Sequence, residues 1–263
     1  MSKTRRALLW LLALALLKAP LDALLANLLP DASVNMLPGC MAGAAVSLLL
    51  LGLPALRLRP WTSERLVRRG RLWEGILLGA LISVLTRAAL TPVDVVWQGW
   101  LSLSPEVLSA PQEISAAVAC VIMLAAVPAL TEEAFFRGAL LTGLLDGSRR
   151  ATAALLTTLA FTLMHDSAAN LPSLLAVSLM LTLLMLYTGR VAVPVTAHFV
   201  YNLLALVPVR LPVWGSLLAG AVLVSMAGWM CIRQPKRAHL PIKAGDGLLA
   251  CMAMAVLAAL YLI

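Results

Sequence analysis

Residues 131–141 read TEEAFFRGALL and place three ionisable side chains, Glu132, Glu133 and Arg137, in an otherwise apolar neighbourhood. At bilayer depth each such group costs roughly 2.5 to 3.5 kcal/mol on insertion scales, so groups of this kind usually line a cavity or a site. The stretch therefore predicts an intramembrane site, and its partners have to come from other segments of the chain.

The composition is that of a membrane protein. Hydrophobic residues make up 62% of the chain, charged residues make up 12%, and the mean hydropathy is +0.95. These values exclude a soluble domain and are typical of a polytopic helical membrane protein. The net charge of +8 comes mostly from short loops, and no basic face is interleaved with exposed aromatics, so we expect a lipid bilayer and no nucleic acid as partner. The cysteines stand singly, without the spacing of a disulfide framework or a zinc knuckle.

Apolar runs near the length of about 20 residues that a transmembrane helix needs extend over the whole chain. We therefore expect an all-α transmembrane helical bundle of eight or nine spans, forming a single domain over residues 1–263. The fourth run, 113–145, is too long for one straight span, and Pro128 is expected to break it. The predicted spans are 7–29, 36–56, 72–90, 113–145, 151–168, 172–188, 191–208, 212–232 and 247–263.

Loop charges predict the orientation of these spans. Basic clusters begin at Lys3 and recur in every second loop, whereas the intervening loops carry acidic residues such as Asp94. By the positive-inside rule the N-terminus is cytoplasmic. Arg87 is expected to snorkel from the end of the third span. The Ala- and Leu-rich composition, with Arg in excess over Lys, favours a bacterial inner membrane.

A helical hairpin is expected to place Glu132 beside a second polar residue. The DGSRR turn at 146–150 joins the fourth and fifth spans, and Glu132 and His165 lie about 16 residues from its centre on either side. Two antiparallel helices then place them at the same depth. His198, in HFVYN, is the other intramembrane histidine, and Asn202 follows it by one helical turn on the same face.

Each of these residues also has a structural interpretation. Glu133 and Arg137, at i,i+4, could simply neutralise one another, and a membrane histidine is often an interhelical hydrogen-bonding residue. Taken together, however, the unpaired carboxylate of Glu132 with two histidines and an amide at similar depth favours a catalytic site.

Three motifs in this order resemble those of a known family. EEAFFR resembles E-E-x-x-x-R, FTLMH resembles F-x-x-x-H and HFVYN resembles H-x-x-x-N of the CPBP (CAAX protease and bacteriocin-processing, or Abi) intramembrane proteases, which include the type II CAAX prenyl endopeptidases. The motif-bearing core runs from about 113 to 208. The resemblance implies an intramembrane active-site cavity, reached from the cytoplasmic side, in which a peptide bond near a substrate's C-terminus is hydrolysed.

The resemblance also implies a role for each motif residue. Glu132 is the expected catalytic carboxylate and His165 its partner in activating water, while His198 and Asn202 stabilise the oxyanion. The expected supporting residues are Glu133, Arg137 and Phe161.

The resemblance leaves open whether the reaction is of glutamic or metallo type. Glu132, His165 and His198 could form a three-ligand zinc site. However, the H-E-x-x-H helix that supplies two ligands and a base is absent, so we favour a mechanism without a metal or other cofactor and keep Zn²⁺ as the alternative.

The expected function is intramembrane endopeptidase activity on a membrane-anchored protein or peptide, cleaved near its C-terminus or its membrane anchor. The alternative is a non-proteolytic member of the same fold, acting in bacteriocin self-immunity or as a membrane scaffold. A proton-coupled transporter is disfavoured because inverted repeats with paired broken helices are not evident. The sequence does not predict an oligomeric state.

Overall fold

The computed structural model describes residues 1–28, 36–58, 66–103, 114–165, 167–207, 211–233 and 244–261. These ranges contain helices and no strands, as the apolar periodicity predicts. In chain order the helices are α1 (Lys3–Leu28), α2 (Met36–Ser47), η1 (Leu48–Gly52), α3 (Leu53–Leu58), α4 (Leu72–Trp100), α5 (Ile114–Cys120), η2 (Val121–Ala126), α6 (Val127–Glu133), η3 (Ala134–Leu141), α7 (Thr142–Gly147), α8 (Arg150–Leu163), η4 (Ala168–Asn170), α9 (Leu171–Thr188), α10 (Ala192–Ala205), α11 (Val213–Ile232) and α12 (Ala244–Tyr261).

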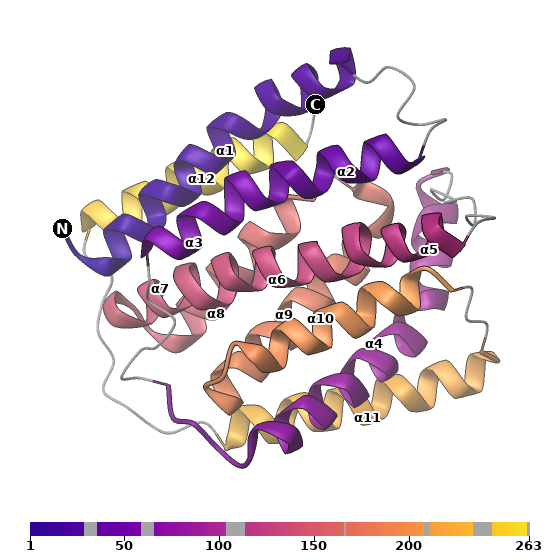
Figure 1. Ribbon diagram of the computed structural model, residues 1–263. Helices are drawn as coiled ribbons and strands as arrows, with labels where there is room; N and C mark the ends of the chain where they lie inside the picture. Colours follow the sequence, from indigo (N-terminus) through magenta and orange to yellow (C-terminus); the bar gives the residue numbers. More distant parts are fainter. Residues whose placement is uncertain are drawn as a thin grey trace.

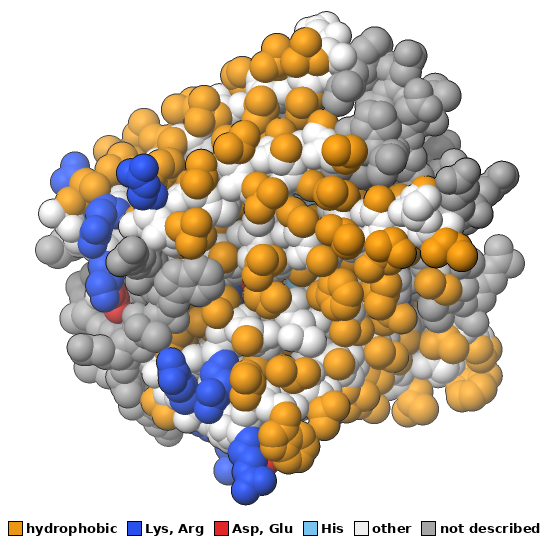
Figure 2. All heavy atoms as spheres, in the orientation of Figure 1, with side chains coloured by type: hydrophobic (Ala, Val, Ile, Leu, Met, Phe, Trp, Pro, Cys, Tyr) orange, Lys and Arg blue, Asp and Glu red, His pale blue; other side chains and the backbone are white. Residues whose placement is uncertain are grey.

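The bundle is built to lie in lipid. Within the described ranges, six helices are long and apolar enough to cross a membrane, and three further apolar helices are shorter, namely α8, α10 and most of α12. At 1.5 Å per residue, the 14 residues of α8 or of α10 extend only about 21 Å, against a hydrocarbon core of about 30 Å. Hydrophobic side chains cover the face seen in Figure 2, as contact with lipid requires.

The helices fall into two packed groups joined through the middle of the bundle. In Figure 1, α1 and α12 lie side by side at one edge and α4 and α11 at the other, with the helix that contains α6 and α7 between them. One buried cluster joins residues of α1, η3, α7, α8 and α12, and a second joins α4, α9, α10 and α11. The polar motif residues lie where the two groups meet.

The fourth predicted span is one helix of 34 residues, Ile114–Gly147, and the predicted break at Pro128 is wrong. The backbone stays helical because it changes its hydrogen bonding before the proline. In η2 the bonds widen to the π pattern, and the N–H of Val127 donates to the carbonyl of Ile122, five residues earlier. A second π segment, η3, follows the two glutamates, and π segments in long helices often mark functional sites.

The third predicted span is also longer than expected, and two interpretations drawn from its ends are corrected. Helix α4 continues to Trp100, so Arg87 lies well inside the helix and Asp94 belongs to it rather than to a loop. Arg87 does not snorkel past a helix end, because it interacts with Asp94 and with Tyr201 of α10. Asp94 is 7% exposed and accepts a hydrogen bond from the hydroxyl of Ser173 on α9.

Close packing of α4 on α10 fixes the helix that carries His198. A Cβ added at Gly79 would lie 3.2 Å from both the Ala197 side chain and the Val193 carbonyl oxygen. One turn further on, the buried Ser83 hydroxyl donates to the carbonyls of Gly79 and Ala197. Small side chains thus let the two backbones approach, as is usual for helix pairs in membranes.

Candidate active site

Three side chains converge inside the bundle, each from a different helix. Glu132 belongs to α6, His198 belongs to α10, and His165 lies two residues past the end of α8. Glu132 Oε2 lies 3.5 Å from His165 Nε2 and 4.0 Å from His198 Nε2. The proximity of Glu132 and His165 that the hairpin spacing predicts is confirmed, and His198 joins them.

Both histidines turn Nε2 toward Glu132 because their Nδ1 atoms have other partners. His165 Nδ1 lies 2.8 Å from the carbonyl oxygen of Phe161, and His198 Nδ1 lies 2.9 Å from Glu133 Oε1. A carbonyl and an ionised carboxylate only accept hydrogen bonds, so Nδ1 carries the hydrogen in each ring, and Nε2 of a neutral ring is an acceptor. Three acceptors therefore face one another, and a proton on one imidazole or a water molecule held between them supplies the donor.

Glu133 and Arg137 form a fully buried ion pair. Arg137 Nη1 donates to Glu133 Oε1 over 2.7 Å, and both side chains are 0% exposed. The same Glu133 oxygen accepts from His198 Nδ1, so the pair expected to be structural also orients a motif histidine. Glu132, Glu133 and Arg137 together carry two carboxylates and one guanidinium, so Arg137 can neutralise only one of the two carboxylates.

Ser178 accepts hydrogen bonds from Arg137, and the sequence did not predict this contact. Arg137 Nη2 donates to both the backbone oxygen and the hydroxyl of Ser178, each at 2.8 Å. Ser178 lies on α9 and is 0% exposed. Serine is common in membrane helices, and no motif spacing distinguished this one from its neighbours in the sequence.

Phe161 stands between the two histidines. Its ring centroid lies 4.4 Å from that of His165 and 5.7 Å from that of His198, and the Arg137 guanidinium carbon lies 4.6 Å from the ring centre. Phe136 packs edge-on against Phe161 on another side. One buried ring therefore contacts both imidazoles and the arginine, which is a larger contribution than the i,i+4 spacing of Phe161 and His165 suggests.

Asn202 lies one turn after His198 on α10 and is half-buried. Its amide makes no hydrogen bond to the part of the chain that the structure describes, so it differs from the other motif residues in having no fixed partner. The preceding residue, Tyr201, belongs to a different group of polar side chains, because it interacts with Ser173 and Arg87.

Comparison with known proteins agrees with the motifs. Residues 114–204 match the family model described as type II CAAX prenyl endopeptidase Rce1-like. This segment is similar to that family. The match contains all the motif residues, confirms the CPBP resemblance and implies a protease in general. Neither the curated proteins nor the solved structures include a match to the chain.

A cavity of about 160 Å³ adjoins the Rce1-like motif residues. Glu132 and His165 line one side of it, together with Phe136 and Met164. Helix α1 contributes Lys18 to the lining, and α2 and η1 contribute Gly43, Val46, Ser47, Leu50 and Leu51. The segment outside the Rce1-like match therefore completes the enclosure of the site.

Zn²⁺ is the alternative to a metal-free mechanism at this site. Within the described ranges, no group of three His, Cys, Asp or Glu side chains is arranged so that it could hold a metal ion. Glu132, His165 and His198 are the set that the sequence offers. His198 Nε2 is 4.0 Å from Glu132 Oε2, and Glu133 and Arg137 hold the imidazole through its other nitrogen.

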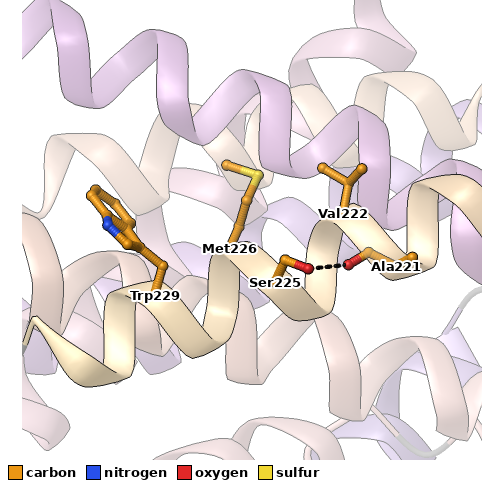
Figure 3. A pocket seen from close by; sticks show the side chains of 5 residues that line it. All are labelled: Ala221, Val222, Ser225, Met226 and Trp229. Carbon is orange, nitrogen blue, oxygen red and sulfur yellow. Dashed lines mark hydrogen bonds between the residues drawn. The ribbon is translucent and has the colours of Figure 1, made fainter.

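Other hollows lie on the lipid-facing surface, away from the Rce1-like motifs. One of about 380 Å³ lies along α11, where the hydroxyl of Ser225 is already bonded to a backbone carbonyl of its own helix (Figure 3). A larger groove of about 1210 Å³ lies between α4, α9 and α11 and is lined by apolar side chains with Ser216. Neither presents the titratable groups that hydrolysis needs.

Proposed function

We propose that this chain is an intramembrane endopeptidase that hydrolyses a peptide bond near the C-terminus or the membrane anchor of a membrane-associated protein or peptide. The observation that carries the proposal is the convergence of both imidazole Nε2 atoms on Glu132 Oε2 in a nearly buried site. The Rce1-like match over the same helices supports it. Glu132 Oε2 is buried and accepts no hydrogen bond from the described residues, which leaves it available to a water molecule.

In this proposal Glu132 and His165 activate water. One hydrogen of the water is directed to Glu132 Oε2 and the other to His165 Nε2, and the oxygen attacks the carbonyl carbon of the peptide bond. When the C–N bond breaks, the proton taken up by Glu132 passes to the leaving amine, so no other reactant is required.

His198 and Asn202 are proposed to stabilise the oxyanion. Because His198 Nδ1 is bonded to Glu133, His198 can donate to the oxyanion only through Nε2, and only when that nitrogen carries a hydrogen. The Asn202 amide, without a partner among the described residues, is available as the second donor. One such donor is worth about 3 to 4 kcal/mol of transition-state stabilisation in a dry site.

The test uses purified protein in detergent and a membrane-anchored reporter peptide, with cleavage measured by mass spectrometry. We expect Glu132→Gln, His165→Ala and His198→Ala each to abolish cleavage while the protein still elutes as a folded species. Glu74→Gln, at the start of α4, is the control, and it should keep full activity. Cleavage retained by any of the three variants contradicts the proposed site, and no cleavage by the wild-type protein favours the non-proteolytic alternative.

A further inference from the structure

A second group of polar side chains lies outside the candidate active site and joins three helices. The Tyr201 cluster, as we call it, comprises Arg87 and Asp94 of α4, Ser173 of α9 and Tyr201 of α10. Asp94 and Ser173 are buried, and the other two are half-buried. Ionisable side chains in membrane-spanning helices are costly and usually have a role beyond packing. The mechanism proposed above uses none of these four residues.

The hydrogen bonds of the Tyr201 cluster run in one direction. The Ser173 hydroxyl donates to Asp94 Oδ2 and also interacts with the side chain of Tyr201. A hydroxyl has one hydrogen, so Ser173 can only accept from the Tyr201 hydroxyl, and Arg87, which only donates, meets the Tyr201 oxygen. Arg87 also attracts the Asp94 carboxylate. The Tyr201 hydroxyl is therefore held between a residue of α9 and a residue of α4.

The Tyr201 cluster continues the seam along which α4 and α10 pack side by side (Figure 1). Ser83 donates to the carbonyl of Ala197, and four residues further along each helix Arg87 interacts with Tyr201. Equal steps along both helices keep the same two faces together, because residues four apart are neighbours on a helix surface. The face of α10 that carries Ala197 and Tyr201 is thus the face turned toward α4.

The two motif residues of α10 each follow a residue of this seam. His198 comes directly after Ala197, and Asn202 comes directly after Tyr201. One residue is a rotation of about 100° in an α-helix, so both side chains leave α10 on the flank beside the seam. Glu133 holds His198 there through Nδ1, whereas Asn202 makes no hydrogen bond to the described part of the chain. The rotation of α10 at Tyr201 therefore decides where the Asn202 amide points.

We propose that Tyr201 is a positioning residue for Asn202. Its hydroxyl, held by Ser173 and Arg87, fixes the rotation of the end of α10 and thereby the direction of the Asn202 amide. The inference rests on the proposed function, in which Asn202 is the second donor to the oxyanion, and it adds a residue that does not touch the substrate. Loss of the Tyr201 hydroxyl acts on the transition state rather than on substrate binding.

The test compares Tyr201→Phe with Tyr187→Phe, because both changes remove one hydroxyl and keep the ring. Tyr187 lies on α9, its ring contacts Trp229, and its hydroxyl makes no hydrogen bond within the described ranges. We expect Tyr201→Phe to lower kcat about tenfold with KM little changed, since a displaced donor weakens only the transition-state contact. Tyr187→Phe should change neither. Size-exclusion chromatography and thermal melts establish that the variants are folded.

Coupling to Asn202 separates a positioning role from a merely structural one. Asn202→Ala removes the donor itself and should lower kcat by about 10² to 10³. In this background Tyr201→Phe should lower kcat by less than a further factor of about two, because the amide that it orients is gone. Ser173→Ala, which removes the acceptor of the Tyr201 hydroxyl, should behave in the same way. Multiplicative losses in the double variants, full activity of Asn202→Ala or an unchanged kcat for Tyr201→Phe overturns the proposal.

A second measurement does not require catalysis. The rate at which Asn202→Cys reacts with N-ethylmaleimide in detergent is measured in a background in which alanine replaces Cys40, Cys120, Cys231 and Cys251. We expect Tyr201→Phe to raise that rate several-fold, because the end of α10 is no longer held, and Tyr187→Phe to leave it unchanged. An equal rate with and without the Tyr201 hydroxyl overturns the proposal. Cleavage by Glu132→Gln contradicts the proposed function instead, and the labelling result still decides whether Tyr201 fixes the end of α10.

Discussion

Replacing Arg137 by methionine should destabilise the protein more than the same replacement of any exposed arginine. Three hydrogen bonds, of 2.7, 2.8 and 2.8 Å, are lost, and Glu133 stays behind with 0% exposure and without its arginine partner. Removing one member of a buried ion pair costs about 3 to 5 kcal/mol, because the other charge remains desolvated. We expect a loss of this size in the free energy of unfolding.

The matching experiment is a double-mutant cycle with Glu133→Gln, measured by unfolding in mixed micelles with tryptophan fluorescence. Glu133→Gln with Arg137→Met removes both charges, so its cost should fall below the sum of the single costs by about 2 to 3 kcal/mol. The exposed Arg149→Met on the same hairpin should change stability by no more than about 0.5 kcal/mol. A cost under about 1 kcal/mol for Arg137→Met, or additive costs in the cycle, would refute the reasoning.

Three further outcomes are expected. Phe161→Leu should lower kcat about tenfold with a smaller change in KM, because both imidazoles lose a ring that orients them. This role would be contradicted if the loss of activity at each temperature matched the loss of folded protein. Gly79→Val should cost about 1 to 3 kcal/mol of stability, because the new side chain crowds Ala197 next to His198. A Cβ added at Gly99 has no neighbouring atom within 4 Å, so Gly99→Val should show only the change in helix propensity. Chelator-treated enzyme should remain active and elemental analysis should find no stoichiometric zinc; a loss of activity that zinc restores would reverse our preference for a metal-free mechanism.

The hairpin spacing predicted the proximity of Glu132 and His165 correctly because it depends only on the rise per residue of a helix. Two antiparallel helices that share a tight turn keep equal depth at equal distance from it, whatever their side chains are, and this was enough to bring Glu132 to His165. The apolar runs predicted the helical bundle for a similar reason, since a helix satisfies its own backbone hydrogen bonds in lipid.

Side-chain direction could not be obtained in this way. The bond from His198 to Glu133, rather than to Glu132, depends on how α10 is rotated against α6, and that rotation is set by the packing of α10 on α4. Ser178 was missed because a hydroxyl in an apolar run has no periodicity of its own. The extension of α4 was missed because Asp94, seen alone, looks like a loop residue until Ser173 is placed beside it.

The break expected at Pro128 failed for a local physical reason. A proline removes one backbone donor, which interrupts an α-helix only if the other hydrogen bonds stay in the α pattern. The wider bonds of η2 accommodate the missing donor, and the helix continues through Pro128. Hydropathy carries no information about such a change of helical pitch.

The close packing of η3 also bears on the electrical insulation of the membrane. A cavity that admits water to a carboxylate and two histidines could carry protons across the bilayer if it extended to both faces, and such a leak would dissipate the transmembrane potential. All eight residues of η3, Ala134–Leu141, are buried, so no residue of this helix is open to water. Substitutions that thin this segment, such as Leu140→Gly, are therefore expected to impair growth through ion leakage even where catalysis is already abolished.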